Sequence, residues 1–427
     1  MKPLLIKGGR IVDPSQGHDG VGDLLLLDGK VESLGPGLGA PDGAAVLEAG
    51  GKVVAPGLVD IHVHLREPGR EDAETVATGA AAAVAGGFTS ICAMPNTDPV
   101  TDNQAAVGFI VKQAQAAGAA RVYPIAAISM GLKGEQLAEF GELIHAGAVG
   151  VSDDGHPVAS SHLMRAALEY SLTFGIPVAD HCEDPWLFEG GAMHEGLVSS
   201  RLGLKGIPSA TEAIMVARNI MLADLTGGHV HLLHMSARSS LELIRRAKDR
   251  GIKVTAEATP HHFTLTDAAC EDYDTNAKMN PPLREGDDVT AIREGLKDGT
   301  LDAIATDHAP HHYETKERDF ADAPFGVVGL ETALGLGLSE LVGAGVLTLP
   351  ELISKMSTEP ARIYNLPAGT LRPGSPADVV VFDPEVKWQV EPGEFRSRSQ
   401  NTPFAGRELA GRVEHTIVGG TQVYSAR

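Results

Sequence analysis

The sequence predicts an α/β fold: a (β/α)8 barrel of the TIM type joined to a small β-sandwich domain built from both termini. Three observations predict it. Apolar runs alternate with helical segments from about residue 53 to residue 305, and about eight of these runs resemble strands. Such alternation is typical of parallel strands joined by crossovers, and eight strands close a barrel. Both ends of the chain contain short strand-like runs separated by turns.

An open, doubly wound sheet is the alternative for the alternating region. No Gly-x-Gly-x-x-Gly follows a first strand, so a dinucleotide-binding fold is disfavoured.

The first residues are predicted to form short strands. Apolar runs at 4–7, 10–12, 23–27 and 30–34 are separated by turns, and Gly and Pro dominate from there to residue 41. In the middle region we expect strands at 53–59, 88–94, 122–127, 148–151, 177–180, 229–234, 253–257 and 303–307. The helices between them are expected at 73–85, 103–117, 135–146, 161–173, 209–226, 239–250 and 288–297.

The C-terminal part begins with helical segments, one after residue 329 and one at 349–364. Strands are then predicted at 378–383, 387–390 and 415–424. Because the two ends resemble each other and differ from the middle, we expect one composite β domain of residues 1–55 and 367–427. The barrel, residues 56–366, is inserted between its two halves.

Composition excludes several classes of protein. The formal net charge of −21 disfavours nucleic acid and anionic membranes as partners. The three cysteines (Cys92, Cys182 and Cys270) are odd in number and form no Cys-x-x-Cys, so neither a disulfide framework nor a zinc ribbon is indicated. The N-terminus lacks a signal-peptide pattern, and no apolar run approaches the roughly 20 residues of a membrane span. We therefore expect a cytoplasmic location and no membrane association.

Histidines and aspartates follow several of the predicted barrel strands. His62 and His64 alternate at the end of the first strand and therefore share one face. A lone His-x-His pair is more often a pair of ordinary polar residues than a metal site. Here, however, similar residues follow later strands, at the barrel edge where functional residues gather. They are Asp153, Asp154, His181, His234, Asp307 and His308. Nitrogen and carboxylate ligands without thiolate suit two divalent ions, zinc first, then cobalt, manganese or iron.

Parity divides the histidines of the run at 229–234. His229 and His231 share one face of the strand and His234 lies on the other, so only one set can face inward. We expect His234 to be the metal ligand, because it is nearest the C-terminal end of the strand. We expect His229 and His231 to be buried against helices. His261 and His262 follow another strand end and are expected to shape the pocket rather than bind metal.

Five segments together resemble the dihydroorotases of the amidohydrolase superfamily. The resemblance covers nearly the whole chain, and the first and last segments are specific in combination. The segments are Asp60-Ile-His-Val-His-Leu-Arg-Glu-Pro-Gly, Ala93-Met-Pro-Asn-Thr-Asp-Pro, His181-Cys-Glu-Asp, Lys278-Met-Asn-Pro-Pro-Leu-Arg and Ala305-Thr-Asp-His-Ala-Pro-His. The resemblance implies a zinc-dependent cyclic amidohydrolase of pyrimidine biosynthesis. It would close N-carbamoyl-L-aspartate reversibly to L-dihydroorotate and water.

The resemblance also implies roles for the metal-binding residues. His62 and His64 would hold one zinc ion, His181 and His234 the other, and Asp154 would bridge them. Asp307 would be a ligand of the first ion and the general acid/base. The choice of Asp154 over Asp153 rests on the resemblance alone. Many relatives in the superfamily bridge with a carboxylated lysine, but no lysine stands beside this strand end. That favours the subgroup with a bridging aspartate.

The chemistry expected from such a site is hydrolytic. A metal lowers the pKa of bound water from about 15.7 towards roughly 7 and stabilises an oxyanion. Asp307 would take the proton from the nucleophile and return it to the leaving nitrogen. Arg66, Asn96 and His311 would hold the substrate carboxylate, because Arg pairs well with a planar carboxylate. Asn280 and the backbone around Phe325 and Gly326 would contact the ring amides.

Other interpretations stay open at this point. Another cyclic amidase, such as an allantoinase or hydantoinase, is the main rival within enzymes. A non-catalytic scaffold for a transcarbamoylase is a rival from another class, although the sequence keeps every expected ligand. We expect a homo-oligomer, with aspartate transcarbamoylase as a candidate partner. The charged segment 311–324 is either a lid over the site or a plain surface loop.

Overall fold

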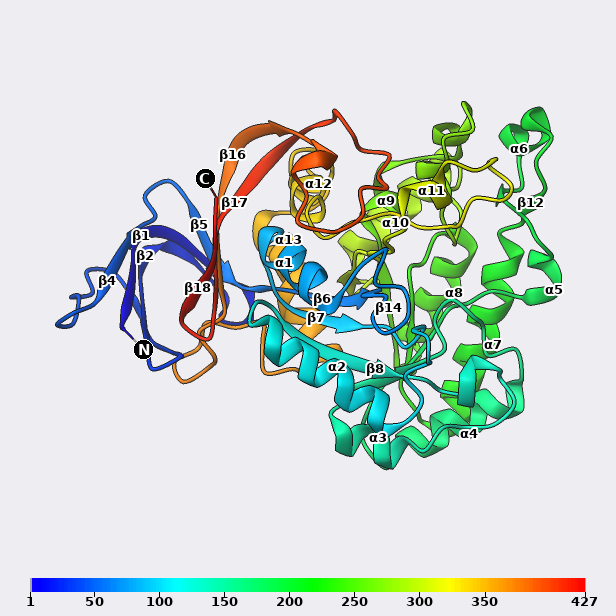
Figure 1. The fold of residues 1–427 in the computed structure, drawn as a ribbon, viewed down its shortest axis with the longest axis horizontal. Coiled ribbons are helices and arrows are strands. Elements are labelled where there is room, and N and C mark those ends of the chain that lie inside the picture. The colour runs from blue at the N-terminus through cyan, green and yellow to red at the C-terminus, as the bar shows by residue number, and fades with distance from the viewer. Residues whose placement is uncertain (1, 427) are drawn as a thin grey trace.

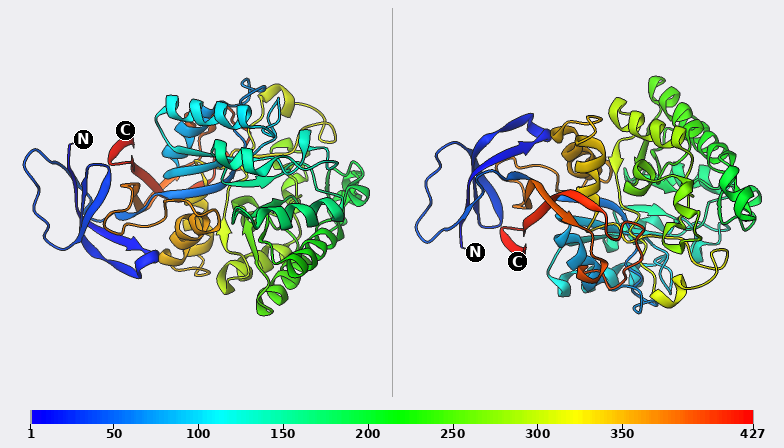
Figure 2. Two further views of the ribbon diagram at one scale, coloured as in Figure 1. Left: turned by 90° about the horizontal axis from the view of Figure 1, so that it is seen from below. Right: turned by 90° about the horizontal axis from the view of Figure 1, so that it is seen from above.

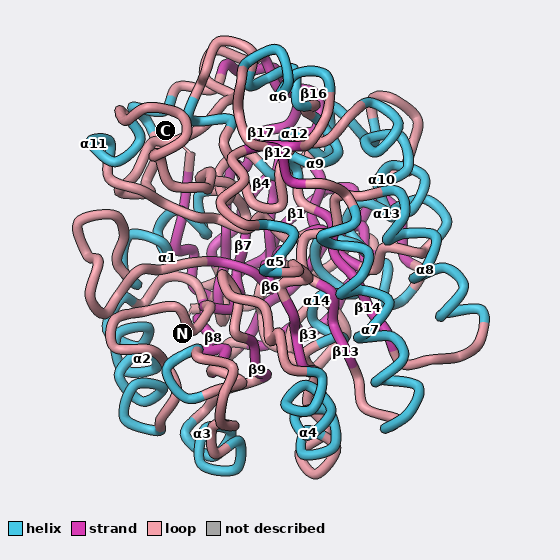
Figure 3. Tube along the Cα trace, turned by 90° about the vertical axis from the view of Figure 1, so that its right-hand side faces the viewer, coloured by secondary structure: helices cyan, strands magenta, loops and turns pink. Residues whose placement is uncertain are grey.

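The chain forms a barrel with a sheet from both termini at one end. A computed structural model describes residues 2–426 (Figure 1). The two ends of the chain lie near each other beside the terminal sheet, as both views of Figure 2 show. Viewed from the opposite end, the barrel strands are surrounded by helices (Figure 3). No helix within residues 2–426 is both long and apolar enough to cross a membrane.

The barrel contains eight parallel strands among the described residues, as predicted. In spatial order they are β6 (Leu58–Val63), β7 (Phe88–Ala93), β8 (Arg121–Ala126), β9 (Gly150–Ser152), β10 (Val178–Asp180), β13 (Val230–Leu232), β14 (Val254–Ala258) and β15 (Ala303–Ile304). The sheet closes between its first and last strands: Val63 bridges His308, and the His64 N–H donates to the His308 carbonyl at 2.8 Å. The residues that follow each strand therefore meet at one end of the barrel.

Helices pack around the outside of the barrel through small and aliphatic side chains. The first helix is rich in Ala and buries Ala80 and Ala83 against the strands. The N-terminus of the second helix is capped by the Asn103 side chain, which accepts hydrogen bonds from the backbone N–H groups of Ala105 and Ala106. The longer helices are α1 (Val76–Ala85), α2 (Gln104–Ala117), α3 (Phe140–Ala146), α4 (Ser161–Ser171), α6 (Leu197–Leu202), α7 (Ala210–Thr226), α8 (Arg238–Asp249) and α10 (Gly286–Asp298). The shorter ones are α5 (Pro185–Phe188), α9 (Pro260–Thr264), α11 (Tyr313–Lys316), α12 (Ala333–Gly337), α13 (Leu349–Ile353) and α14 (Glu359–Ile363).

The terminal strands form one continuous mixed sheet with its own small core. It contains β1 (Leu4–Asp13), β2 (His18–Leu27), β3 (Lys30–Gly35), β4 (Ala45–Glu48), β5 (Val53–Pro56), β16 (Val379–Gln389), β17 (Glu408–Val418) and β18 (Thr421–Ser425). Strand β5 pairs with β1 on one side and β16 on the other, so it joins the N-terminal and C-terminal parts. Ile6, Val54 and Val381 are fully buried in the core that this sheet encloses.

The prediction of one strand at 53–59 was wrong. The segment is two strands in two different sheets, β5 in the terminal sheet and β6 in the barrel. Gly57 separates them, and a Cβ there would lie 2.1 Å from the Thr89 hydroxyl oxygen. Only glycine fits this close approach. The division of the chain after residue 55 stays a prediction, although the change of sheet occurs close to it.

Other differences concern segments whose patterns were ambiguous. The helix expected from residue 135 begins at Phe140. The helix expected at 349–364 contains a π-helical turn, Ser354–Thr358, between α13 and α14. Strand β4 was missed, because Gly and Pro surround it. A two-stranded sheet, β11 (Met193–His194) and β12 (Gly206–Ile207), lies in the long excursion after β10 and was also missed.

Candidate metal centre

Three predicted ligands from two strands form the first of two side-chain groups. His62 and His64 come from the end of β6, and Asp154 follows β9. One ligand atom from each lies within 4.8 Å of the others. The Nε2 atoms of both histidines are 3.3 Å from Asp154 Oδ2. All three side chains are buried, so these polar atoms converge away from bulk solvent.

The second group shares Asp154 with the first. Its other members are His181, which follows β10, and His234, which follows β13. His234 Nε2 lies 3.4 Å and His181 Nδ1 3.6 Å from Asp154 Oδ1. Each carboxylate oxygen therefore faces a different pair of imidazoles.

The donor set fits two divalent ions bridged by one carboxylate. His62 Nε2 and Asp154 Oδ1 are buried and have no hydrogen-bond partner among the described residues. His181 Nδ1 and His234 Nε2 are only 2.9 Å apart. Buried polar atoms normally have partners, and two bare ring nitrogens do not attract unless one carries a proton. A cation between each set of donors would satisfy them.

Asp307 joins the first group from the end of β15. Its Oδ1 lies 3.1 Å from His64 Nε2 and 3.5 Å from His62 Nε2. The residue has a φ of +49°, an uncommon backbone conformation that directs the carboxylate into the site. Burial favours the neutral acid, but His62 and His64 outweigh it and hold the pKa of Asp307 below its usual value.

The two adjacent aspartates have different environments. Asp154 lies in both groups, and its pKa is far below the usual value because His62, His181 and His234 outweigh the effect of burial. Asp153 points elsewhere: its carboxylate accepts the backbone N–H groups of Ile128 and Ser129 and the Ser129 hydroxyl. Burial raises the pKa of Asp153 to about 6. The structure thus separates two residues that the local sequence could not.

Arg66 and His311 lie beside the first group with free hydrogen-bonding atoms. Arg66 is 7% exposed, and its one acceptor within residues 2–426 is the Pro310 carbonyl, 3.1 Å from Nε. Its Nη atoms therefore remain available to an anion. His311 Nε2 contacts the Phe325 carbonyl at 2.7 Å, and its Nδ1 is buried with no partner in the described part of the chain. Burial and the nearby Arg66 lower the pKa of His311, which keeps its ring neutral.

Asn96 and Asn280, both predicted to contact substrate, also contact predicted metal ligands. Asn96 Oδ1 lies 2.8 Å from His64 Nδ1, so this amide orients the imidazole. Asn280 Nδ2 donates to Glu183 at 2.7 Å and lies 3.3 Å from His181 Nε2. Their roles toward substrate stay predictions.

The backbone around Phe325 and Gly326 has protein partners. The Phe325 carbonyl contacts His311, and the Gly326 N–H donates to the Lys278 carbonyl at 2.9 Å. The segment 311–324, which precedes it, includes the short helix α11. Its Lys316 Nζ donates to the carbonyls of Thr275 and Pro324, so the segment is attached to the neighbouring loop.

The expectation that His229 and His231 pack against helices was wrong. His231 Nε2 lies 3.0 Å from Glu257 Oε2, and Glu257 Oε1 lies 2.6 Å from His62 Nδ1. Both histidines also contact the Thr255 hydroxyl. His231 therefore faces the barrel interior, and the half-buried His229 lies on the same side, just before the start of β13. Parity failed because β13 ends at Leu232 and His234 has a φ of +36°, which turns its side chain inward as well.

Two glutamates near the centre were missed. Glu257 lies in β14 and is fully buried, and Glu183 lies beside His181 and Asn280. A signal existed for Glu257: it is the one charged residue inside the short apolar run 254–258. A charge in a buried strand requires partners, which makes such a residue a candidate for the site.

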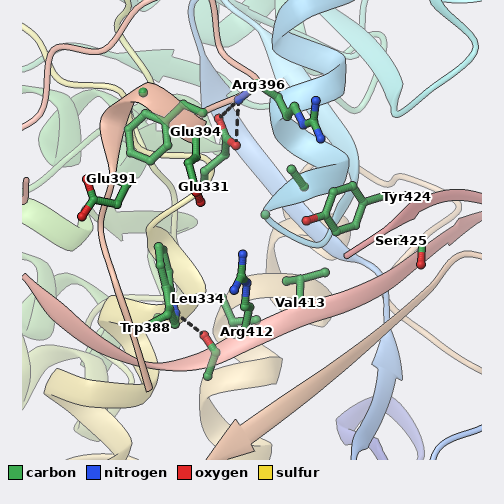
Figure 4. Close-up of a pocket in the computed structure, with 16 residues that line it drawn as sticks. Glu331, Leu334, Trp388, Glu391, Glu394, Arg396, Arg412, Val413, Tyr424 and Ser425 are labelled. Carbon is green, nitrogen blue, oxygen red and sulfur yellow. Dashed lines mark hydrogen bonds between the residues drawn. The ribbon is translucent and has the colours of Figure 1, made fainter. Parts of the chain in front are cut away.

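A cavity of about 530 Å³ lies elsewhere, between α12, β16 and β17 (Figure 4). Its lining includes the acidic Glu331, the basic Arg412 and the aromatic Trp388 and Tyr424. The Glu331 carboxylate accepts the Arg396 backbone N–H, so it supports the adjacent loop. None of the predicted metal or substrate residues lines this cavity.

The barrel and the paired histidine and aspartate groups define an amidohydrolase, and comparison with known proteins agrees. A family model described as "Amidohydrolase family" matches residues 225–424, and one described as "Dihydro-orotase-like" matches residues 51–240. The chain belongs to the dihydroorotase family. A dihydroorotase of Geobacter metallireducens is 54% identical to it, and one of Pelotomaculum thermopropionicum is 55% identical. Each alignment covers 99% of both chains.

Solved structures with the same architecture come from a related group. An L-hydantoinase (dihydropyrimidinase) from Arthrobacter aurescens superposes with a TM-score of 0.89 at 27% identity, covering 100% of this chain and 96% of the other. A D-hydantoinase (dihydropyrimidinase) from a Thermus species gives 0.83 at 25% identity, covering 99% and 96%. The predicted family and fold are thus confirmed.

Proposed function

We propose that this enzyme is a dihydroorotase that closes N-carbamoyl-L-aspartate to L-dihydroorotate and water, and also runs in reverse. The observation that carries the proposal is the sharing of Asp154 between two imidazole pairs, with Asp307 beside the first. The full-length similarity to dihydroorotases supports the substrate assignment.

We further propose two zinc ions as cofactors. His62, His64 and Asp307 would hold one, His181 and His234 the other, and Asp154 both. When bound, zinc supplies Lewis acidity and lowers the pKa of a coordinated water to about 7. Nitrogen and oxygen donors, with every cysteine outside the two groups, are consistent with zinc.

The residues of the chain would orient the substrate and move its proton. Asp307 lies in the first group as an ionised carboxylate, so it can accept the proton of the attacking water and deliver it to the ring nitrogen. Ring closure uses the same groups in the opposite order. Arg66 would bind the substrate carboxylate through its free Nη atoms. His311 is proposed as a further substrate contact: its Nε2–H donates to the Phe325 carbonyl, so its Nδ1 can accept a hydrogen bond from a substrate N–H. Asn96, Asn280, Phe325 and Gly326 are proposed as the remaining substrate contacts.

Arg66 provides a test that separates this substrate from neutral cyclic amides. Replacing it with Ala should lower kcat/KM for dihydroorotate by about 10- to 100-fold, since a charge-assisted hydrogen bond contributes about 1.5–3 kcal/mol. Most of the loss should be a higher KM. Hydrolysis of hydantoin, which has no carboxylate, should change little if it is measurable at all.

The matched control is Arg70→Ala, because Arg70 is exposed and four residues away. It should leave both substrates unaffected. If Arg66→Ala left dihydroorotate turnover intact, the assigned substrate would be wrong. The hydantoinase alternative, which the solved structures raise, would then be favoured.

Activity of the purified chain alone is the direct test. Dihydroorotate hydrolysis with zinc supplied can be followed by ultraviolet absorbance, and turnover would support the assignment. Zinc binding without turnover would favour a scaffold or a required partner, and addition of an aspartate transcarbamoylase would distinguish these two. We propose a cytoplasmic homo-oligomer, and a sedimentation experiment would check its assembly.

A further inference from the structure

Glu257 is a buried carboxylate beneath the two side-chain groups. It has no exposed surface, and three donors surround it. Oε1 lies 2.6 Å from His62 Nδ1 and 3.2 Å from the His234 backbone nitrogen, and Oε2 lies 3.0 Å from His231 Nε2. One carboxylate therefore contacts a predicted ligand of each metal ion.

The hydrogen bonds fix the direction of every proton around this carboxylate. An ionised carboxylate only accepts, so His62 carries its proton on Nδ1 and His231 on Nε2. The Thr255 hydroxyl lies 2.8 Å from His231 Nδ1 and 2.8 Å from His229 Nε2. It can donate to the first and accept from the second, which satisfies the whole chain with neutral imidazoles.

The consequence for His62 is a single tautomer. With its proton on Nδ1, its Nε2 presents a lone pair toward Asp154, and Nε2 is the atom that has no hydrogen-bond partner among residues 2–426. His234 needs a different support, because its backbone has a φ of +36° outside any strand. The hydrogen bond from its N–H to Glu257 holds that conformation.

We propose that Glu257 is a positioning residue for both halves of the metal centre, setting the tautomer of His62 and the backbone of His234. His231 holds its second oxygen. Partners of this kind orient metal ligands, and their loss typically weakens metal affinity by about 10- to 100-fold. The inference rests on the proposed metal centre.

The test is zinc affinity of the purified, metal-stripped enzyme, measured by competition with a chromogenic chelator. Glu257→Met keeps the volume and removes both acceptors, so affinity should fall by about 100-fold. Glu257→Gln keeps one acceptor, so its zinc affinity should fall by only about 10-fold. Cobalt-loaded samples should show a changed visible absorption spectrum, which a loss of stability alone would not produce.

Glu74→Gln is the matched control. Glu74 is equally buried and lies 3.2 Å from the Nε2 of His308, which is not a predicted ligand. The Glu74→Gln substitution should lower the free energy of unfolding and leave zinc affinity unchanged. Parent-like affinity and spectrum in Glu257→Met would overturn the inference, as would an equal loss in Glu74→Gln. If Glu257→Met does not fold, Glu257→Gln decides by the same criteria. A parent enzyme that binds no zinc would refute the metal centre itself.

Discussion

Replacing Asp307 with Asn is expected to reduce dihydroorotate hydrolysis by about 10²- to 10⁴-fold, the usual contribution of a positioned general acid/base. The amide has nearly the same shape but cannot accept a proton at neutral pH. It also loses the charge that faces His62 and His64. The loss should appear mainly in kcat, because Asp307 is proposed to act on the reacting atoms rather than on the substrate carboxylate. Initial rates by ultraviolet absorbance, with zinc content determined on the same samples, provide the measurement.

Asp287→Asn is a suitable control for the charge change. Its side chain is 92% exposed at the start of α10 and should leave activity unaffected. A variant with Asn at position 307 that retained both zinc and near-normal kcat would exclude Asp307 as the proton carrier. Glu183, whose carboxylate lies 3.6 Å from His181 Nε2, would then be the next carboxylate to test.

The sequence was most informative where geometry follows from topology. Parallel strands place the residues that follow them at one end of a barrel, so His62, His181 and Asp307 could be assigned to one site without coordinates. The structure brings their side chains together as that rule requires. The resemblance to dihydroorotases added the choice between Asp153 and Asp154. The separate hydrogen bonds of Asp153 provide a physical reason for that choice.

The sequence was least informative where a single backbone angle changes a side chain's direction. Alternation assumes a regular strand, but His234 follows the end of β13 in a left-handed conformation. His231 and His234 can therefore both face inward, which no period-two pattern predicts. Gly57 is similar, because its need for glycine comes from Thr89 on the neighbouring strand. Such contacts depend on packing between distant segments, and a local pattern contains no information about them.

Removal of the proposed bridging carboxylate should have the second large effect. Asp154→Ala is expected to lose at least one of the two proposed zinc ions and to reduce activity by more than about 100-fold. Loss of a residue that only hydrogen-bonds to a metal ligand already lowers metal affinity or activity by about 10- to 100-fold. Asp154 should have a larger effect, because it belongs to both ligand groups. Metal content after dialysis, together with the hydrolysis rate, measures this effect. Added zinc should restore little activity, because the shared ligand is missing.

Asp153→Ala is the neighbouring control, and it should have the opposite profile. Its carboxylate accepts hydrogen bonds from the backbone N–H groups of Ile128 and Ser129. The variant leaves these buried groups unpaired, so its free energy of unfolding should fall by about 1–3 kcal/mol. Zinc content should stay at the parent level, and urea denaturation would measure the stability. If Asp153→Ala lost zinc while Asp154→Ala retained it, the bridge would be assigned to the wrong aspartate. The proposed pairing of the four histidines would then fail with it, because both pairs are defined by their distances to Asp154.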